Sequence, residues 1–147
     1  MYTRVKSEAE IKAMRESGRM LAVVLDLLVD SVQAGMTTKD LSNIAAAKLK
    51  ELGGKPAFLG YEGYRDVLCV SVNDEVVHGI PGNKIIEDGD IVSVDFGVNY
   101  KGMITDAARS VIVGNTPDPE DVELLQATLR SLDAGIFMAK GGCRVGH

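Results

Sequence analysis

Residues 91–113 read IVSVDFGVNYKGMITDAARSVIV, and this stretch decides the fold. Residues 91–98 and 103–113 are rich in β-branched residues, which is typical of β-strands. The four residues between them, NYKG, favour the tight turn of a hairpin. Each run carries one aspartate near its middle, although aspartate is a poor strand residue. The stretch therefore predicts an antiparallel hairpin with two acids embedded in it.

The two acids are Asp95 and Asp106, and the position of the turn decides how they lie. If the turn is centred between Tyr100 and Lys101, the aspartates are directly opposed on one face, with Cβ atoms about 4.5–5.5 Å apart. Like charges that close repel each other. A bound divalent cation would offset this repulsion, because such cations prefer carboxylate oxygens as ligands.

Two other interpretations of the aspartate pair stay open on the hairpin alone. The acids could share one proton, which also removes the repulsion. Alternatively, the true register differs and one of the two side chains faces solvent. The spacing of the pair does not choose among the three.

His78 is a second candidate functional residue, within the segment VVHGIP at residues 76–81. The pKa range of histidine suits proton donation or hydrogen bonding to a reacting carbonyl group. A single histidine is also commonly structural, so this residue alone does not establish a site.

Residues 58–69, FLGYEGYRDVLC, form a third candidate feature before a predicted strand. Aromatic residues and a cysteine cluster here around glycines, a composition that can build a small apolar pocket. Ordinary packing of a loop explains the same composition. The residues concerned are Phe58, Tyr61, Tyr64 and Cys69.

Helices are expected on both sides of the strand region. Ser7 and Glu10 form a capping box that begins a first helix, which should end near Gly35. A second helix should begin at residue 37 or 38 and end at residues 53–54, GG.

The remaining elements complete the expected order. Residues 67–72 predict a strand, 75–78 a short extended return, and 118–140 a helix with an apolar stripe. Helices, then strands, then a helix predict an α+β fold, an antiparallel sheet covered by helices.

Composition limits the functional classes. The 147 residues fit a single domain, and 46% apolar with 25% charged residues is typical of a globular protein. A net charge of −5 argues against nucleic-acid binding. Two cysteines make no disulfide framework, and we find neither a signal-peptide pattern nor an apolar run long enough for a membrane. We therefore expect a cytoplasmic protein without membrane partners.

Three motifs in this sequence resemble those of the type I methionine aminopeptidases. They are VSVNDEVVHGIP at residues 70–81, DGDIVSVDFG at 88–97 and TDAAR at 105–109. The resemblance extends from about residue 7 to 145. It implies one half of the pita-bread fold, in which two similar αβ halves enclose the active site. By this resemblance, residues 1–147 are the N-terminal portion of a longer metallopeptidase catalytic domain.

The resemblance also implies roles for individual residues. Asp95 resembles the bidentate ligand of one metal ion, and Asp106 resembles the carboxylate that bridges two. His78 resembles the catalytic histidine that contacts the substrate amide, and Thr105 matches a position near the metals. The substrate pocket would be lined by Tyr61, Tyr64 and Cys69 and bordered by Phe58. The cofactors would be two divalent ions of manganese, iron, cobalt or zinc.

The activity implied is removal of the initiator methionine from nascent proteins, whose N-terminal methionyl peptides would be the substrates. The family's site also needs a histidine in a Gly-His-Gly segment and two glutamates from the second half, and His147 does not match that histidine. We therefore expect this chain alone to be inactive. Its partners would be the missing C-terminal half or a second copy.

Three rival interpretations remain. A non-catalytic peptide- or partner-binding module of the same fold usually lacks the aspartate pair, which this chain keeps. A related peptidase that cleaves before proline is the second rival, although the segment 70–81 and the two-tyrosine loop favour methionine removal. A structural protein with an acidic hairpin leaves the three motifs unexplained.

Overall fold

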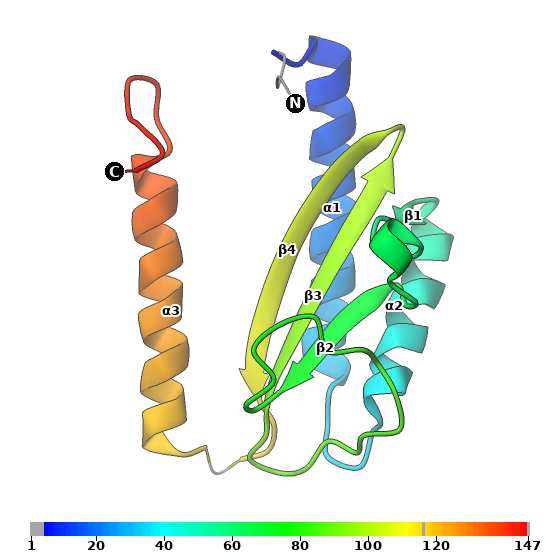
Figure 1. Ribbon diagram of the computed structural model, residues 1–147, viewed down its shortest axis with the longest axis vertical. Coiled ribbons are helices and arrows are strands. Elements are labelled where there is room, and N and C mark those ends of the chain that lie inside the picture. Colours follow the sequence, from blue (N-terminus) through cyan, green and yellow to red (C-terminus); the bar gives the residue numbers. More distant parts are fainter. Residues whose placement is uncertain (1–4, 116, 147) are drawn as a thin grey trace.

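The computed structural model describes residues 5–115 and 117–146. His147, which does not match the expected ligand histidine, lies outside the described residues. The fold is α+β, with a four-stranded antiparallel sheet covered on one face by two helices (Figure 1). The elements are α1 (Glu8–Ser31), α2 (Thr38–Leu52), β1 (Lys55–Pro56), η1 (Tyr61–Gly63), β2 (Leu68–Val72), β3 (Ile91–Tyr100), β4 (Met103–Ile112) and α3 (Pro119–Met138).

Capping residues fix where the first two helices begin. The predicted capping box of Ser7 and Glu10 begins α1, and Thr37 with Asp40 makes a second one at α2. Gly53 ends α2 in the left-handed conformation, with φ of 80°. The first helix ends at Ser31, earlier than the predicted Gly35. The amide of Gly35 instead donates to the carbonyl of Ile86, so this segment pairs with a loop.

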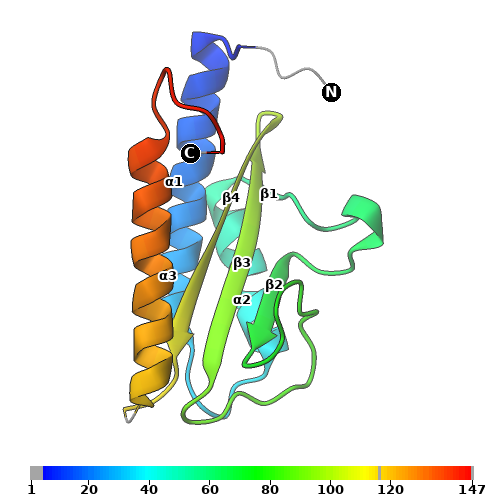
Figure 2. The same ribbon diagram turned by 60° about the vertical axis from the view of Figure 1, so that its left-hand side comes forward.

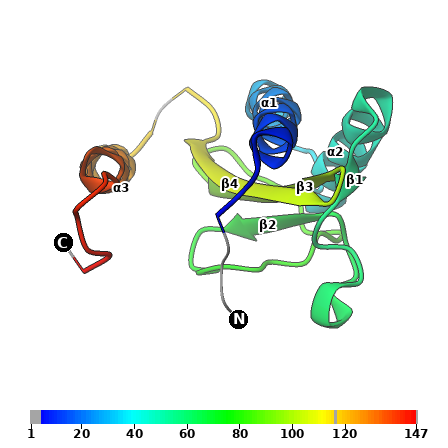
Figure 3. The ribbon, with the colours of Figure 1, turned by 90° about the horizontal axis from the view of Figure 1, so that it is seen from above.

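The core lies between the helix pair and the sheet. Alternate residues of a strand point to opposite faces, and one set on β2 and β3 packs beneath α1 and α2 (Figure 3). The other set faces away from the helices. The buried set is Leu68, Val70, Val72, Val92, Val94, Phe96 and Val98, which meets Met20, Leu21, Val24, Leu25, Leu28, Leu41, Ala45 and Leu49.

Strand β3 is the centre of the sheet. β4 pairs with it along one edge, whereas β2 and the short β1 follow each other along its other edge. No sequence pattern predicted β1, which is only two residues long. The predicted extended return at residues 75–78 is wrong, since these residues lie in a loop without strand pairing.

The hairpin turn lies one residue later than predicted. Lys101 and Gly102 form the two-residue turn with φ of 51° and 80°, and Tyr100 pairs with Met103. Positive φ at both turn residues matches the twist of the strands, and glycine accepts it at little cost. The predicted direct opposition of the two aspartates is therefore wrong. Asp95 pairs with Ala108, and Asp106 pairs with Gly97.

The shifted register still keeps both aspartates on one face. The pairing changes by two residues, and side chains two positions apart on a strand point the same way. Asp95 and Asp106 are thus diagonal neighbours on the face away from α1 and α2. The register does differ, as the second alternative required, and Asp106 is exposed; but both side chains lie on this one face, where Asp95 is partly buried.

Helix α3 begins as predicted but packs on almost nothing. Asp118 caps it by accepting from the Glu120 amide, and Pro119 occupies its first position. None of its residues, all of which the structure describes, is buried. Figures 1 and 3 show the helix standing apart from α1 and α2, beyond β4. Across residues 5–115 and 117–146, no helix combines the length and apolar character needed to cross a bilayer.

Candidate active site

Seven of the eight candidate site residues, all except Thr105, line one pocket on the sheet face opposite the helices. Its volume is about 800 Å³. Figure 2 shows the loop with η1 projecting on this side of the sheet, away from α1. The pocket is lined by Phe58, Tyr61, Glu62, Gly63, Tyr64, Arg65, Cys69, His78, Ile80, Asp95 and Asp106.

The sheet forms the acidic floor of this pocket. Cys69 on β2 is the direct cross-strand partner of Asp95 on β3, and Asp106 follows diagonally on β4. Three adjacent strands thus contribute one chemical group each to a single surface. A sheet is a rigid support, so these groups are held in place without help from a flexible loop.

The two carboxylates interact strongly. Burial of Asp95, followed by the charge of Asp106 and a hydrogen bond with it, raises the pKa of Asp95 to about 6. The charge of His78 opposes this rise. Two acids in such contact need a shared proton or a cation, as the hairpin alone already indicated. The geometry is consistent with both solutions.

The donor set fits part of a divalent metal site. Two carboxylates on one rigid surface suit a hard or borderline divalent cation. Within residues 5–115 and 117–146, no group of three or more histidine, cysteine, aspartate or glutamate residues is placed to hold a metal ion. Asp95 and Asp106 would therefore supply only some of the ligands.

The loop between β1 and β2 forms the apolar wall. The rings of Phe58 and Tyr64 meet edge to face, with centroids 6.4 Å apart. A Cβ atom on Gly97 would lie 2.6 Å from Cε1 of Phe58, so only glycine lets this ring rest on β3. Tyr61 is 68% exposed and borders the opening.

Cys69 lies in the pocket as a neutral thiol. Burial raises the pKa of Cys69; a hydrogen bond with Tyr64 opposes this, whereas the charge of Asp95 adds to it. The thiolate is the reactive form of cysteine, so these surroundings suit an inert lining residue. Cys69 and Cys143 are both free, in agreement with the absence of a disulfide framework.

His78 enters the pocket from the loop at residues 73–81. Its φ is 58°, a left-handed conformation that is uncommon for residues other than glycine. Such strain persists where surrounding contacts fix the backbone, and it clusters at functional sites.

Thr105 does not lie where the resemblance implied. Its hydroxyl is 2.7 Å from that of Ser17 on α1, which also donates to the Val98 carbonyl. The side chain of Thr105 therefore points to the helix face, whereas Asp106 points to the pocket. Alternation along the strand gives the physical reason for the difference.

Sequence reasoning missed two residues that support the pocket. Gly97 was detectable as a glycine inside a β-branched run, which commonly marks a close approach of another segment. Asp66 gave no such signal. It is buried and accepts from Nζ of Lys39 at 2.6 Å, from the Ser42 hydroxyl and from the Val67 amide at 2.7 Å. These bonds tie the end of the aromatic loop to α2.

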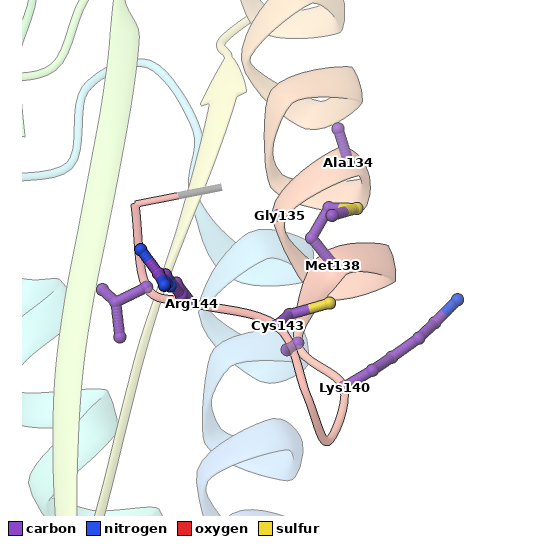
Figure 4. Close-up of a pocket in the computed structure, with 8 residues that line it drawn as sticks. Ala134, Gly135, Met138, Lys140, Cys143 and Arg144 are labelled. Carbon is purple, nitrogen blue, oxygen red and sulfur yellow. The ribbon is translucent and has the colours of Figure 1, made fainter.

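A second cavity, of about 580 Å³, lies at the C-terminal end of α3 (Figure 4). Among its lining residues are Met138, Lys140, Cys143 and Arg144. It contains no carboxylate side chain among its lining residues and none of the seven candidates. The chemistry is therefore concentrated in the pocket on the sheet.

The sequence matches the model of metallopeptidase family M24 over residues 12–147. The chain belongs to metallopeptidase family M24. Among curated M24 relatives, it is 42% identical to methionine aminopeptidase 1 of Bacillus subtilis over 142 residues, 97% of this chain and 57% of the relative. It is 41% identical to the methionine aminopeptidase of Aquifex aeolicus, covering 99% of this chain and 59% of the relative.

Solved structures agree with the M24 assignment. The methionine aminopeptidase of Thermotoga maritima superposes with a TM-score of 0.91 at 42% identity, over 95% of this chain and 56% of that one. The prolidase of Pyrococcus furiosus shares the fold, with a TM-score of 0.77 at 20% identity. The prediction of one half of the pita-bread fold is confirmed. This chain spans little more than half the length of these methionine aminopeptidases.

Proposed function

We propose that this chain forms the first half of the catalytic domain of a metal-dependent aminopeptidase that removes N-terminal methionine from nascent proteins. The observation that carries the proposal is a single pocket that joins two carboxylates from adjacent strands to an apolar wall. Relatives at about 42% identity are methionine aminopeptidases, which supports the same activity.

The apolar wall would select the methionine side chain. Phe58, Tyr61, Tyr64 and the neutral thiol of Cys69 present aromatic and polarisable surface. A flexible thioether makes favourable contacts with aromatic rings and adapts to irregular space. The nearby acidic floor would place the scissile peptide bond beside Asp95 and Asp106.

Asp95 and Asp106 would be the metal ligands of this half. Two divalent ions would be bound in the complete site, and carboxylate ligands admit manganese, iron, cobalt or zinc. When bound, such ions polarise a carbonyl group and activate a water molecule for attack. The remaining ligands would come from a further part of the protein.

His78 would hold the substrate amide next to the reacting carbonyl. A hydrogen-bond donor fixed beside the carbonyl stabilises the negative charge that develops on its oxygen. We assign His78 this catalytic role because it lines the pocket together with both aspartates.

Within residues 5–115 and 117–146, helix α3 has exposed apolar side chains that a partner surface would cover. Leu129, Leu132 and Ile136 on α3 are 58%, 58% and 62% exposed. The missing C-terminal half is the partner we propose for this surface, since the relatives extend well beyond the matched region. A self-associated dimer is the alternative. Without that half the chain would be inactive in the cytoplasm, the location we expect for it.

The same observations give less support to the rival activities. Peptidases that act before proline match at 20–24% identity, a level that supports the fold alone. A non-catalytic binding module would have no need for two interacting carboxylates inside an apolar pocket.

A peptidase assay on the complete gene product tests the proposal. Cleavage of peptides beginning Met-Ala, Ile-Ala and Ala-Pro is compared in the presence of added Mn²⁺, Co²⁺, Fe²⁺ or Zn²⁺. We expect cleavage of the methionyl peptide alone, and its loss in Asp95→Asn and Asp106→Asn. Cleavage of the prolyl peptide, or metal binding without any cleavage, would contradict the assignment. The 147-residue chain tested in parallel should show no turnover.

A further inference from the structure

The peptide unit that follows His78 is held from several sides. The amide of Gly79 donates to the Ser71 hydroxyl at 3.1 Å. The carbonyl of Gly79 accepts from the Val70 amide at 2.9 Å and from the Tyr64 hydroxyl at 3.1 Å. We call these groups of Ser71, Val70 and Tyr64 on Gly79 the Gly79 clamp.

The clamp leaves no room for a side chain on Gly79. A Cβ atom on Gly79 would lie 2.1 Å from the Val70 carbonyl oxygen, which belongs to a buried strand and cannot yield. Glycine is therefore required there for the backbone to approach β2. The residue immediately before it, His78, has the left-handed φ of 58°.

Ser71 accepts from the Gly79 amide through its hydroxyl. Its side chain is 5% exposed and points to the same sheet face as Cys69, beneath the loop at residues 73–81. It does not line the pocket. Removing its hydroxyl would leave the partly buried amide of Gly79 without this acceptor, which costs stability.

The Tyr64 hydroxyl has a role separate from that of its ring. The ring lines the pocket and meets Phe58. The hydroxyl reaches past it to the carbonyls of Leu68 and Gly79, at 3.0 and 3.1 Å. It thereby links the aromatic loop to the loop that carries His78.

The start of the His78 loop is anchored independently of the clamp. The side chain of Asn73 donates to Asp90, and Glu75 forms an ion pair with Lys84 at 2.9 Å. Loss of the Ser71 hydroxyl would therefore loosen His78 without unfolding the whole loop.

We propose that Ser71 and the Tyr64 hydroxyl are positioning residues for His78, acting through the Gly79 peptide. This inference rests on the proposed function, in which His78 holds the substrate amide. Correct orientation of such a group contributes greatly to rate, and small displacements are costly. The clamp should therefore affect turnover more than substrate binding.

Amide hydrogen exchange in the 147-residue chain tests the clamp without any activity. In Ser71→Ala, exchange of the Gly79 amide should become roughly fivefold faster, the effect of one lost hydrogen bond. The matched control is Ser93→Ala, which removes the hydroxyl of the cross-strand partner of Ser71, bonded to Ser110 instead. Unchanged Gly79 exchange in Ser71→Ala would overturn the clamp, whether or not the protein is an aminopeptidase.

Kinetics of the complete gene product test the positioning role. Ser71→Ala and Tyr64→Phe should each lower kcat about tenfold and leave KM for a methionyl peptide within about twofold. In a His78→Ala background neither change should lower kcat further, because groups that act through one another are not additive. An equal loss with and without His78 would show a merely structural role and overturn the proposal. Tyr64→Phe keeps the test decisive if Ser71→Ala does not fold.

Discussion

Strands β3 and β4 differ sharply in burial although they form one hairpin. β3 has buried residues along most of its length, because the helix pair covers one face and strands flank both edges. None of the residues of β4, all described by the structure, is buried, and the same holds for α3 beyond it. The difference shows that an apolar pattern in the sequence can specify a strand or a helix, whereas burial of that strand or helix requires another segment to pack against it. The β3 region forms the centre of the core, whereas the residues of β4 and α3 are exposed or only partly buried.

Substitutions in the β3 region should lower the free energy of unfolding far more than substitutions on α3. Phe96→Ala removes a fully buried ring and should lower the free energy of unfolding by about 3–5 kcal/mol. Leu132→Ala on α3 should change it by no more than about 0.5 kcal/mol. Urea unfolding of the 147-residue chain measures both. Comparable losses would mean that α3 packs against the core in solution, which would break the comparison.

Asp66 connects the aromatic loop to α2. Asp66→Asn should lower the free energy of unfolding of the protein by roughly 2 kcal/mol at neutral pH. Burial acts to raise the pKa of Asp66, but hydrogen bonds from Lys39, Ser42 and the Val67 amide outweigh it and hold the pKa below 3.8. A lowered folded-state pKa contributes stability that is present above pH about 4 and is lost as the pH falls through the folded value. Urea unfolding at pH 7 and at pH 3 should thus show a smaller gap at pH 3. A gap that widens in acid would contradict the network.

Gly97 tests the pocket side of β3. Gly97→Ala places a methyl group within 3 Å of Phe58 and Ala57, so the aromatic loop must shift. We expect a loss of about 1 kcal/mol in stability. We also expect altered NMR shifts for Phe58 and Tyr64. A matched control is Gly18→Ala on α1, where the added Cβ meets nothing within 4 Å. Unaltered Phe58 shifts in Gly97→Ala would mean that this ring does not rest on β3.

Substitutions on the exposed face of α3 should change stability the least and self-association the most clearly. Leu132→Lys with Ile136→Lys places charges on the exposed stripe of α3. The free energy of unfolding should change little, but any self-association at high concentration should fall, as measured by sedimentation velocity. Val23→Lys, at an exposed position on α1, is the matched control. Association that persists in the α3 variant would place the interface elsewhere.

Local patterns predicted much of the fold because they depend on neighbouring residues. The capping box at Ser7 and the proline after Asp118 both begin helices where expected. The hairpin register was off because the turn could be centred at two positions, and backbone conformation chose Lys101-Gly102. The two-residue β1 carried no pattern at all. The location of the protein in the cytoplasm and its extent as one domain stay predictions.

The sequence predicted which residues line the pocket better than it predicted the contacts that hold those residues in place. The seven candidates line one pocket because strand alternation and three motifs constrain them. Asp66, Ser71 and the Tyr64 hydroxyl act through contacts between segments distant in sequence. No periodicity or spacing encodes such contacts. Their roles, and those of the seven candidates, stay proposals.

Paramagnetic Mn²⁺ tests most directly whether the diagonally neighbouring carboxylates Asp95 and Asp106 bind a cation, because its broadening of NMR signals detects even weak binding by an incomplete site. Titrated into the 147-residue chain, it should broaden the amide signals of Asp95, Gly97 and Asp106 first. The same titration of the Asp95→Asn, Asp106→Asn double variant should leave these signals sharp. Broadening that is absent from this surface, or that persists unchanged in the double variant, would contradict the metal site.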